Sequence, residues 1–193
     1  YYSAEPTVFI IVLAMLGACV CLLPNAMPGK WLGLFLILPM LAPEAVGIAH
    51  GQMRVAMFDV GQGLSVLVRT RRHTILYDTA QVGKLNRVVI SHADNDHAGG
   101  LPAIQEQMPI GALQASYPMP GATSCRKGMA WIWDGVHFEY LWPAADTGGS
   151  DNDNSCVLRI EANGRSIILT GDISERAESQ LLAQQGVRMS SEI

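Results

Sequence analysis

Residues Ser91 to Gly100 have the sequence SHADNDHAGG and contain four side chains that can bind a divalent metal: His92, Asp94, Asp96 and His97. In an extended segment, side chains two residues apart point the same way, so the first histidine and the first aspartate can converge on one ion. The two closing glycines allow the backbone to bend, so the second Asp-His pair can turn towards an adjacent position. A polar surface helix is the alternative, but residues i and i+2 do not share a helical face. The stretch therefore predicts a metal site.

Three other carboxylates follow apolar segments that we predict to be strands. Asp59, Asp78 and Asp172 each come directly after or at the end of such a segment. Because a sheet can hold ligands carried on its short loops, we expect these groups to share one edge with the metal-binding stretch. The predicted strands cover residues 53–59, 65–70, 74–77, 88–91, 112–117, 136–141, 156–161 and 165–170, and the predicted helices cover 101–107 and 174–185.

Local signals indicate several connections between these elements. Asn163-Gly164 predicts a two-residue hairpin turn. Ser174 is the expected N-cap of the last helix, and Gly186 is its expected end. Residues 131–133, Trp-Ile-Trp, fit either a strand or a loop.

The apolar excess of the chain is concentrated near its start. Hydrophobic residues make up 49% of the sequence and charged residues only 16%. Thr7 to Leu23 is an uncharged run of 17 residues, which predicts a transmembrane helix at the short end of the usual range. A signal peptide is the alternative, but Tyr1 to Pro6 has no basic residue and carries Glu5.

A second apolar run, from Trp31 to Ala42, has 12 uncharged residues. As a helix it would be about 18 Å long, less than the roughly 30 Å of the hydrocarbon core, so a second span stays open. Lys30 is the only basic residue among the first 53 and lies between the two runs, which favours a cytoplasmic loop. We therefore expect a membrane segment over residues 1–50 and one domain over 51–193, outside the cytoplasm if both runs span.

The cysteines and the net charge leave two questions open. Cys19 and Cys21 lie in the first apolar run, where packing is the default role. Cys125 and Cys156 could pair in an oxidising compartment, but their spacing in sequence does not decide it. A net charge of -4 neither favours nor excludes a nucleic-acid partner, because a basic patch can coexist with an acidic total.

Several motifs taken together resemble a known family. The metal-binding stretch, followed later by Thr-Gly-Asp ending at Asp172, resembles the metallo-β-lactamase superfamily. More narrowly, the chain is similar to the C-terminal domain of ComEC-type competence proteins, the inner-membrane channels for DNA uptake in natural transformation. The motifs of this narrower resemblance are Phe58-Asp59-Val60-Gly61-Gln62-Gly63, Tyr77-Asp78-Thr79, the aspartate Asp94, Asn152-Asp153-Asn154-Ser155-Cys156-Val157-Leu158 and Leu169-Thr170-Gly171-Asp172.

The resemblance implies an αββα sandwich of the α/β class, with metals at one edge of its two sheets. The implied metal ligands are His92, Asp94, Asp96, His97 and Asp172. Asp59 and Asp78 would support the site and, together with Asp96, form the expected catalytic set; Asp96 could orient the nucleophilic water. Asn154 would lie near the site.

Two features differ from the family pattern. No late His-His-Gly-Ser motif follows the helix after Asp172. Only residues 79–86 separate Asp78 from the next strand, where the family has a longer loop and a helix, so one sheet face is expected to be poorly covered. Most of the channel is also absent. We therefore expect a truncated member, incomplete at its C-terminus.

The function implied by the resemblance is metal-dependent cleavage of DNA during uptake. Two divalent ions would activate water against a phosphodiester, and a carboxylate in place of an imidazole favours manganese or magnesium, with zinc possible as well. The implied partners are DNA, as a single strand, the inner membrane and the remaining channel portion, with the domain on the periplasmic side. A hydrolase of a small ester, lactone or thioester and an inactive membrane-tethered binding module stay open as alternatives.

Two further groups of side chains are candidates for substrate contact. Arg69, Arg71 and Arg72 form a tight basic cluster that could meet DNA phosphates. A solvated hairpin tip or attraction to anionic lipid is the alternative. Trp131 and Trp133 are expected to pack in the core, and stacking on single-stranded bases is their alternative role.

Overall fold

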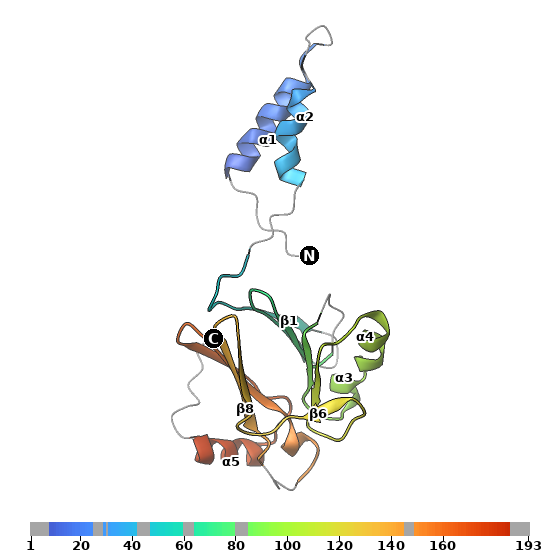
Figure 1. Cartoon of the computed structure of the whole chain (residues 1–193), viewed down its shortest axis with the longest axis vertical. Helices are drawn as coiled ribbons and strands as arrows, with labels where there is room; N and C mark the ends of the chain where they lie inside the picture. The colour runs from blue at the N-terminus through green and yellow to red at the C-terminus, as the bar shows by residue number, and fades with distance from the viewer. Residues whose placement is uncertain are drawn as a thin grey trace. The chain divides into compact units, whose positions relative to one another are not determined.

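The computed structural model describes residues 8–24, 29, 31–41, 47–59, 64–79, 85–144 and 149–185. The chain divides into two compact units, residues 1–47 and residues 48–193 (Figure 1). The boundary predicted from the sequence lies at residue 50. Each unit is described by itself below.

The first unit is a pair of apolar helices, α1 (Val8–Cys21) and α2 (Leu32–Leu41). The helices cross at two glycines: a Cβ added to Gly17 would lie 2.6 Å from the carbonyl oxygen of Gly33. Glycine at this crossing therefore lets the two backbones approach closely.

Neither helix of this pair, nor any other helix in the described ranges, is long and apolar enough to cross a membrane. The helix α1 has 14 residues and α2 has 10. The predicted membrane helix over residues 7–23 is therefore not supported, and neither is the second span left open for residues 31–42. Among the described residues, helix covers 8–21 of the first run and 32–41 of the second.

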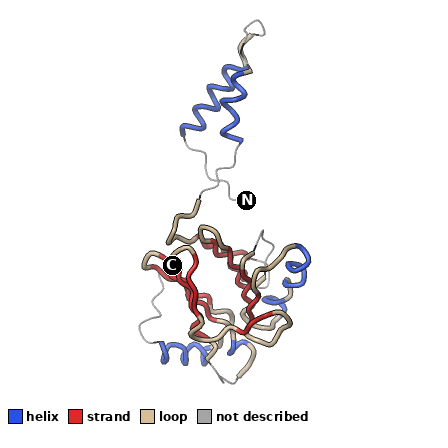
Figure 2. The backbone as a smooth tube through the Cα atoms, viewed as in Figure 1, coloured by secondary structure: helices blue, strands red, loops and turns tan. Residues whose placement is uncertain are grey.

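The second unit contains, within its described residues, a six-stranded and a four-stranded sheet that face each other (Figure 2). The first sheet has the order β1-β2-β3-β4-β5-β6, antiparallel from β1 to β3 and parallel from β3 to β6. The second has the order β10-β9-β8-β7 and is antiparallel. The strands are β1 Arg54–Asp59, β2 Leu64–Arg69, β3 Thr74–Tyr77, β4 Arg87–Ile90, β5 Leu113–Ala115, β6 Ala122–Ser124, β7 Ala130–Trp133, β8 Val136–Trp142, β9 Val157–Ala162 and β10 Arg165–Leu169.

The main core lies between the two sheets. Alternate residues of a strand point to the same face, so Val66 and Val68 on β2 share a buried cluster with Phe138 and Tyr140 on β8. All four side chains are at most 2% exposed. Burial of this apolar surface holds the two sheets together.

Helices cover the outer face of each sheet. The helix α4 (Leu101–Gln107) places Leu101 and Ile104 in a buried cluster with Leu76 on β3 and Val88 on β4. The expectation of a poorly covered sheet face is therefore wrong at β3 and β4, because α4 packs against both strands.

The other outer layer is α5 (Glu175–Gln185), whose Ala177 and Leu181 pack with Leu141 and Trp142 of β8. The order of layers is helix, sheet, sheet, helix (Figure 1). The predicted αββα arrangement is confirmed for the described residues.

A disulfide joins Cys125 to Cys156, with the two Cα atoms 5.9 Å apart. Cys125 follows β6 in the first sheet, and Cys156 precedes β9 in the second. The pairing left open by the sequence is therefore present, and it links the two sheets covalently.

Turn chemistry accounts for two hairpins of the second sheet. Asn163 and Gly164 have φ values of 51° and 75°, as a two-residue hairpin turn requires, so this prediction is confirmed. Asp134 and Gly135, with φ values of 52° and 83°, form an equivalent turn between β7 and β8. The Trp-Ile-Trp segment at residues 131–133 is therefore strand.

The last helix begins at Glu175, one residue after the predicted N-cap. Ser174 Oγ accepts a hydrogen bond from the Ala177 backbone N–H at 3.4 Å, as an N-cap does. The predicted end at Gly186 and residues 60–63 of the Phe58–Gly63 motif lie outside the described residues.

Candidate metal site

His92 lies in the loop that follows β4 and is fully buried. Its Nδ1 lies 3.0 Å from Ser91 Oγ, and this hydroxyl gives its proton to Asp78 Oδ2 at 2.9 Å. The serine oxygen can therefore accept a hydrogen bond from His92 Nδ1, and in the neutral ring this leaves a lone pair on Nε2. Nε2 lies 3.3 Å from Asp94 Oδ2 and has no hydrogen-bond partner among the described residues.

His97 lies on a four-residue helical turn, α3 (Asn95–Ala98), and is 4% exposed. Its Nδ1 lies 2.8 Å from Asp78 Oδ2. Its Nε2 lies 3.4 Å from Asp172 Oδ2 and 3.6 Å from Asp96 Oδ2. This helical turn is absent from the sequence prediction, and it is what carries His97 back beside His92, with ring centroids 4.2 Å apart.

Asp78 is buried behind the two histidines, at 1% exposure and with a φ of 58°. Its Oδ1 accepts a hydrogen bond from the Ser91 backbone N–H at 2.7 Å, and its Oδ2 faces the Ser91 hydroxyl and His97 Nδ1. A carboxylate on the Nδ1 side of a histidine fixes the ring and leaves Nε2 for a metal. Asp78 is therefore buried on the Nδ1 side of the histidines, where its hydrogen bonds fix the orientation of the His97 ring.

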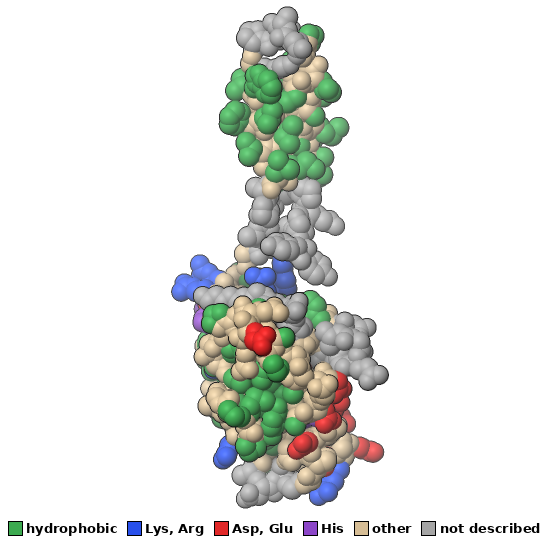
Figure 3. Space-filling view, turned by 90° about the vertical axis from the view of Figure 1, so that its right-hand side faces the viewer, with side chains coloured by type: hydrophobic (Ala, Val, Ile, Leu, Met, Phe, Trp, Pro, Cys, Tyr) green, Lys and Arg blue, Asp and Glu red, His purple; other side chains and the backbone are tan. Residues whose placement is uncertain are grey.

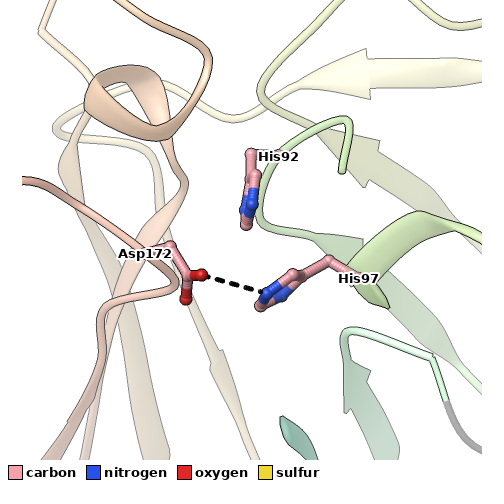
Figure 4. A group of neighbouring side chains, drawn as sticks. All are labelled: His92, His97 and Asp172. Carbon is pink, nitrogen blue, oxygen red and sulfur yellow. Dashed lines mark ion pairs between the residues drawn. The ribbon is translucent and has the colours of Figure 1, made fainter. Parts of the chain in front are cut away.

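The side chains of His92, His97 and Asp172 converge on one point (Figure 4). One nitrogen or oxygen of each lies within 4.8 Å of the other two. Asp172 follows β10 in the second sheet, whereas both histidines belong to the loop after β4 in the first. The site therefore spans the two sheets at their shared edge, as the sequence predicts.

This group of donors fits a divalent ion. The buried and unsatisfied Nε2 of His92 points into the site with its lone pair, which is the arrangement of a histidine ligand. Two imidazoles and a carboxylate match the ligand preferences of Zn²⁺ and of Mn²⁺ and other first-row metals.

The site carries a strong negative field. The side chains of Asp94, Asp96 and Asp172 are 55%, 41% and 52% exposed and lie beside the two histidines. The hydrogen bond to Asp78, opposed by burial and reinforced by the nearby carboxylates, raises the pKa of His97 to about 9. A metal that binds at His97 Nε2 must therefore displace a proton at neutral pH.

Ser91 is the site residue that sequence reasoning missed. Its hydroxyl lies within 3.2 Å of Asp78 and both histidines, and its carbonyl oxygen accepts a hydrogen bond from the Cys156 N–H at 2.9 Å. A small hydroxyl residue directly before the first histidine, at the end of an apolar strand, is the only signal that could have identified it.

A glycine lets the two halves of the site approach. Gly171 has a φ of 59°, and a Cβ added there would lie 2.8 Å from Ser91 Cβ. A side chain at this position would push Asp172 away from the histidines.

Two other predicted site residues, Asp59 and Asn154, each lie at the end of an element of the domain. The backbone of Asp59 ends β1, and its side chain lies outside the described residues. Asn154 closes a short 3-10 helix (Asn152–Asn154), and its Nδ2 donates to the Ser150 carbonyl oxygen at 3.0 Å.

The three predicted arginines lie away from the metal site. Arg69 ends β2 opposite Thr74, the first residue of β3, whereas Asp78 follows the last residue of β3. Arg71 and Arg72 belong to the turn between these strands. About 13 Å of strand therefore separates the arginine cluster from the site edge.

Comparison with known proteins agrees with this geometry. Residues 58–189 match the family described as the metallo-beta-lactamase superfamily. The competence protein ComA of Neisseria gonorrhoeae is 34% identical over 202 aligned residues, which cover 95% of this chain and 29% of that protein. Recombination protein 2 of Haemophilus influenzae is 32% identical over 68% of this chain and 19% of that protein. The resemblance to competence proteins is confirmed, and the chain spans less than a third of the length of these relatives.

Among solved structures, the diiron β-hydroxylase CmlA of Streptomyces venezuelae superimposes with a TM-score of 0.54. The alignment covers 72% of this chain and 33% of that chain, at 13% sequence identity. This likeness supports the fold alone.

Proposed function

Because the chain belongs to the metallo-β-lactamase superfamily, we propose that residues 48–193 form a metal-dependent hydrolase that cleaves phosphodiester bonds of DNA. The observation that carries the proposal is the convergence of His92 Nε2, His97 Nε2 and the Asp172 carboxylate at the edge shared by the two sheets. The choice of DNA rests on the similarity to competence proteins.

A bound metal would supply activated water and would stabilise the charge that develops on a phosphodiester in the transition state. His92, His97 and Asp172 would hold one ion, and Asp94 and Asp96 lie close enough to contribute to a second. The share of carboxylate ligands favours manganese or magnesium over zinc.

The chain's own residues provide orientation and charge. Asp78 and Ser91 hold both imidazole rings through their Nδ1 atoms, so the two Nε2 atoms are fixed before a ligand arrives. Asp96, whose side chain is 41% exposed beside His97, would orient the attacking water.

We also propose an extracytoplasmic location at the inner membrane, with single-stranded DNA and the channel portion of a competence protein as partners. The buried Cys125–Cys156 disulfide favours an oxidising compartment. The similarity to competence proteins favours membrane association.

The test is cleavage of a labelled single-stranded oligonucleotide by the purified chain in the presence of Mn²⁺, Mg²⁺ or Zn²⁺, beside an ester and a thioester substrate. We expect metal-dependent DNA cleavage, lowered about 100-fold or more by His92→Ala and by Asp96→Ala. His137→Ala is the matched control, because His137 lies at the start of β8, at the opposite end of the sheet from the site.

Each other outcome points to a different function. Undiminished cleavage by both variants contradicts the proposal. Turnover of the ester or thioester alone indicates a small-molecule hydrolase. Stoichiometric metal binding, measured by mass spectrometry, without turnover of any substrate indicates a binding module.

A further inference from the structure

The end of the domain opposite the metal site carries a group of arginines. Arg54 on β1 and Arg69 on β2 are paired across the two strands, so their side chains share one face of the sheet. Arg71 and Arg72 lie in the turn that follows, and all four residues are exposed. Figure 3 shows Lys and Arg side chains at the upper end of this domain in that view and others at its lower end, where most of the visible Asp and Glu side chains also lie. We call these four residues the arginine patch.

The guanidinium groups of the arginine patch form no ion pair with a carboxylate among the described residues: none of the four has an Asp or Glu oxygen within ion-pair distance. Like charges placed opposite each other on neighbouring strands repel. The carboxylate that holds this turn, that of Asp134, binds the backbone of Arg72 and not a guanidinium group. In a chain with a net charge of -4, these four exposed positive side chains therefore remain available to an anionic partner.

The turn that carries the patch is held firmly by Asp134. Its Oδ2 accepts hydrogen bonds from Thr70 Oγ1 and from the Arg72 backbone N–H, each at 2.7 Å, and lies 2.9 Å from His73 Nδ1. The carboxylate binds the backbone of the turn and leaves the guanidinium groups free. The patch is therefore a fixed surface on the domain and not a loose hairpin tip.

The aromatic side chains beneath the patch are already occupied by their own neighbours. Trp131 stacks on Phe138 at 5.1 Å, and the Arg87 guanidinium lies 3.9 Å from its ring centroid. Trp133 stacks on His73 at 4.5 Å. These rings are part of the packing, as predicted, and offer no open platform for nucleic-acid bases.

The chain enters the domain beside this patch. The Gly51 N–H donates to the Asp134 carbonyl oxygen at 2.6 Å, and the Asp134 carboxylate binds the Arg72 backbone. The preceding unit, residues 1–47, has helices without a charged residue, and many of their large apolar side chains are exposed, among them Phe9, Phe35 and Leu41. A basic surface next to the entry of an apolar segment is the arrangement that binds anionic lipid headgroups.

We propose that the arginine patch docks on an anionic phospholipid surface. The phosphates of the headgroups would pair with Arg54, Arg69, Arg71 and Arg72, and the metal site, at the opposite end of β2 and β3, would face away from the bilayer. This proposal is independent of the reaction at the metal site.

The experiment is co-flotation of the full chain with phosphatidylcholine vesicles and with vesicles that also contain phosphatidylglycerol, at low and high salt. The test variant is R69Q/R71Q/R72Q. The matched control is R126Q/K127Q/R176Q, which removes the same number of exposed positive charges elsewhere. The variant R69K/R71K/R72K keeps the charge and checks that the turn tolerates substitution.

We expect the unmodified chain, the lysine variant and the matched control to prefer the anionic vesicles at low salt and to lose this preference at high salt. At roughly fivefold per arginine, the glutamine variant should lose on the order of 100-fold of the preference. Binding to pure phosphatidylcholine should be the same for all, because it depends on the apolar unit.

An unchanged preference for anionic vesicles in R69Q/R71Q/R72Q overturns the proposal. If that variant also binds a single-stranded oligonucleotide more weakly, measured by fluorescence anisotropy, the patch is a nucleic-acid surface instead.

Discussion

Asp78 orients both histidines of the site, His97 directly and His92 through the Ser91 hydroxyl. Asparagine at this position keeps one acceptor for the Ser91 N–H, but its amide nitrogen cannot accept from His97 Nδ1 or from the Ser91 hydroxyl. His97 would lose its orientation and its preferred proton position. We expect Asp78→Asn to weaken metal binding about 10- to 100-fold, measured by competition with a chromophoric chelator.

Asp134→Asn is the matched control for this measurement. Like Asp78, Asp134 holds a hydroxyl, a backbone N–H and a histidine, but it does so through Oδ2 alone and at the far end of β3. The Asp134→Asn substitution should lower the stability of the domain without changing its affinity for metal. Equal metal affinity in Asp78→Asn and the unmodified chain would contradict the positioning role.

Asp134 also predicts how stability depends on pH. Burial opposes its ionisation, but the hydrogen bonds from His73, Thr70 and the Arg72 backbone outweigh burial and hold the pKa of Asp134 well below its ordinary value. A carboxyl whose pKa is lowered in the folded state stabilises the fold at pH values above its unfolded pKa of about 3.9. This contribution is lost as the pH falls from that value towards the lower pKa of the folded state.

We therefore expect Asp134→Asn to be less stable than the unmodified chain at neutral pH and the difference to shrink below about pH 4. Urea unfolding of both proteins at a series of pH values measures this difference in the free energy of unfolding. A difference that stays constant from neutral to acid pH would mean that the charge of Asp134 contributes nothing.

At the scale of elements, the disulfide is the covalent link between the sheets next to the site. Cys156 donates its N–H to the Ser91 carbonyl oxygen, so it also touches the metal-binding loop directly. A link across 31 residues restricts the unfolded chain by about 3 to 4 kcal/mol. We expect C125S/C156S to lower the free energy of unfolding by up to this amount.

Urea denaturation of the double variant measures this effect, and reduction of the unmodified chain should reproduce it. Cys19→Ser is the control, because Cys19 is a free cysteine in the first unit. If the double variant unfolds at the same urea concentration as the unmodified chain, the link does not stabilise the domain.

Elements with strong local patterns could be predicted from the sequence, and those formed by long-range contacts could not. Strand β3 has the bounds expected from its apolar residues. Strand β6, Ala122–Ser124, has no strand pattern and exists because it pairs with β5. The same limit applies to the site: spacing identifies the donors, but the hydrogen bonds of Ser91 depend on how the loop folds back.

At the scale of the whole molecule, the two sheets meet at the site, and each supplies part of the donor set. His92 and His97 come from the first sheet and Asp172 from the second. A ligand that binds only the folded arrangement shifts the unfolding equilibrium, by about 2.7 kcal/mol at a concentration 100 times its Kd. Metal binding should therefore stabilise the domain by joining its two sheets.

We expect saturating Mn²⁺ or Zn²⁺ to raise the Tm by roughly 5 to 10 °C, and a chelator to reverse the change. Asp172→Ala should lose most of this rise even though both histidines remain, because the donor from the second sheet is gone. Glu178→Ala, an exposed carboxylate on α5, should behave like the unmodified chain. Differential scanning calorimetry with and without metal decides the question: an undiminished rise in Asp172→Ala would mean that the metal is held by one sheet alone.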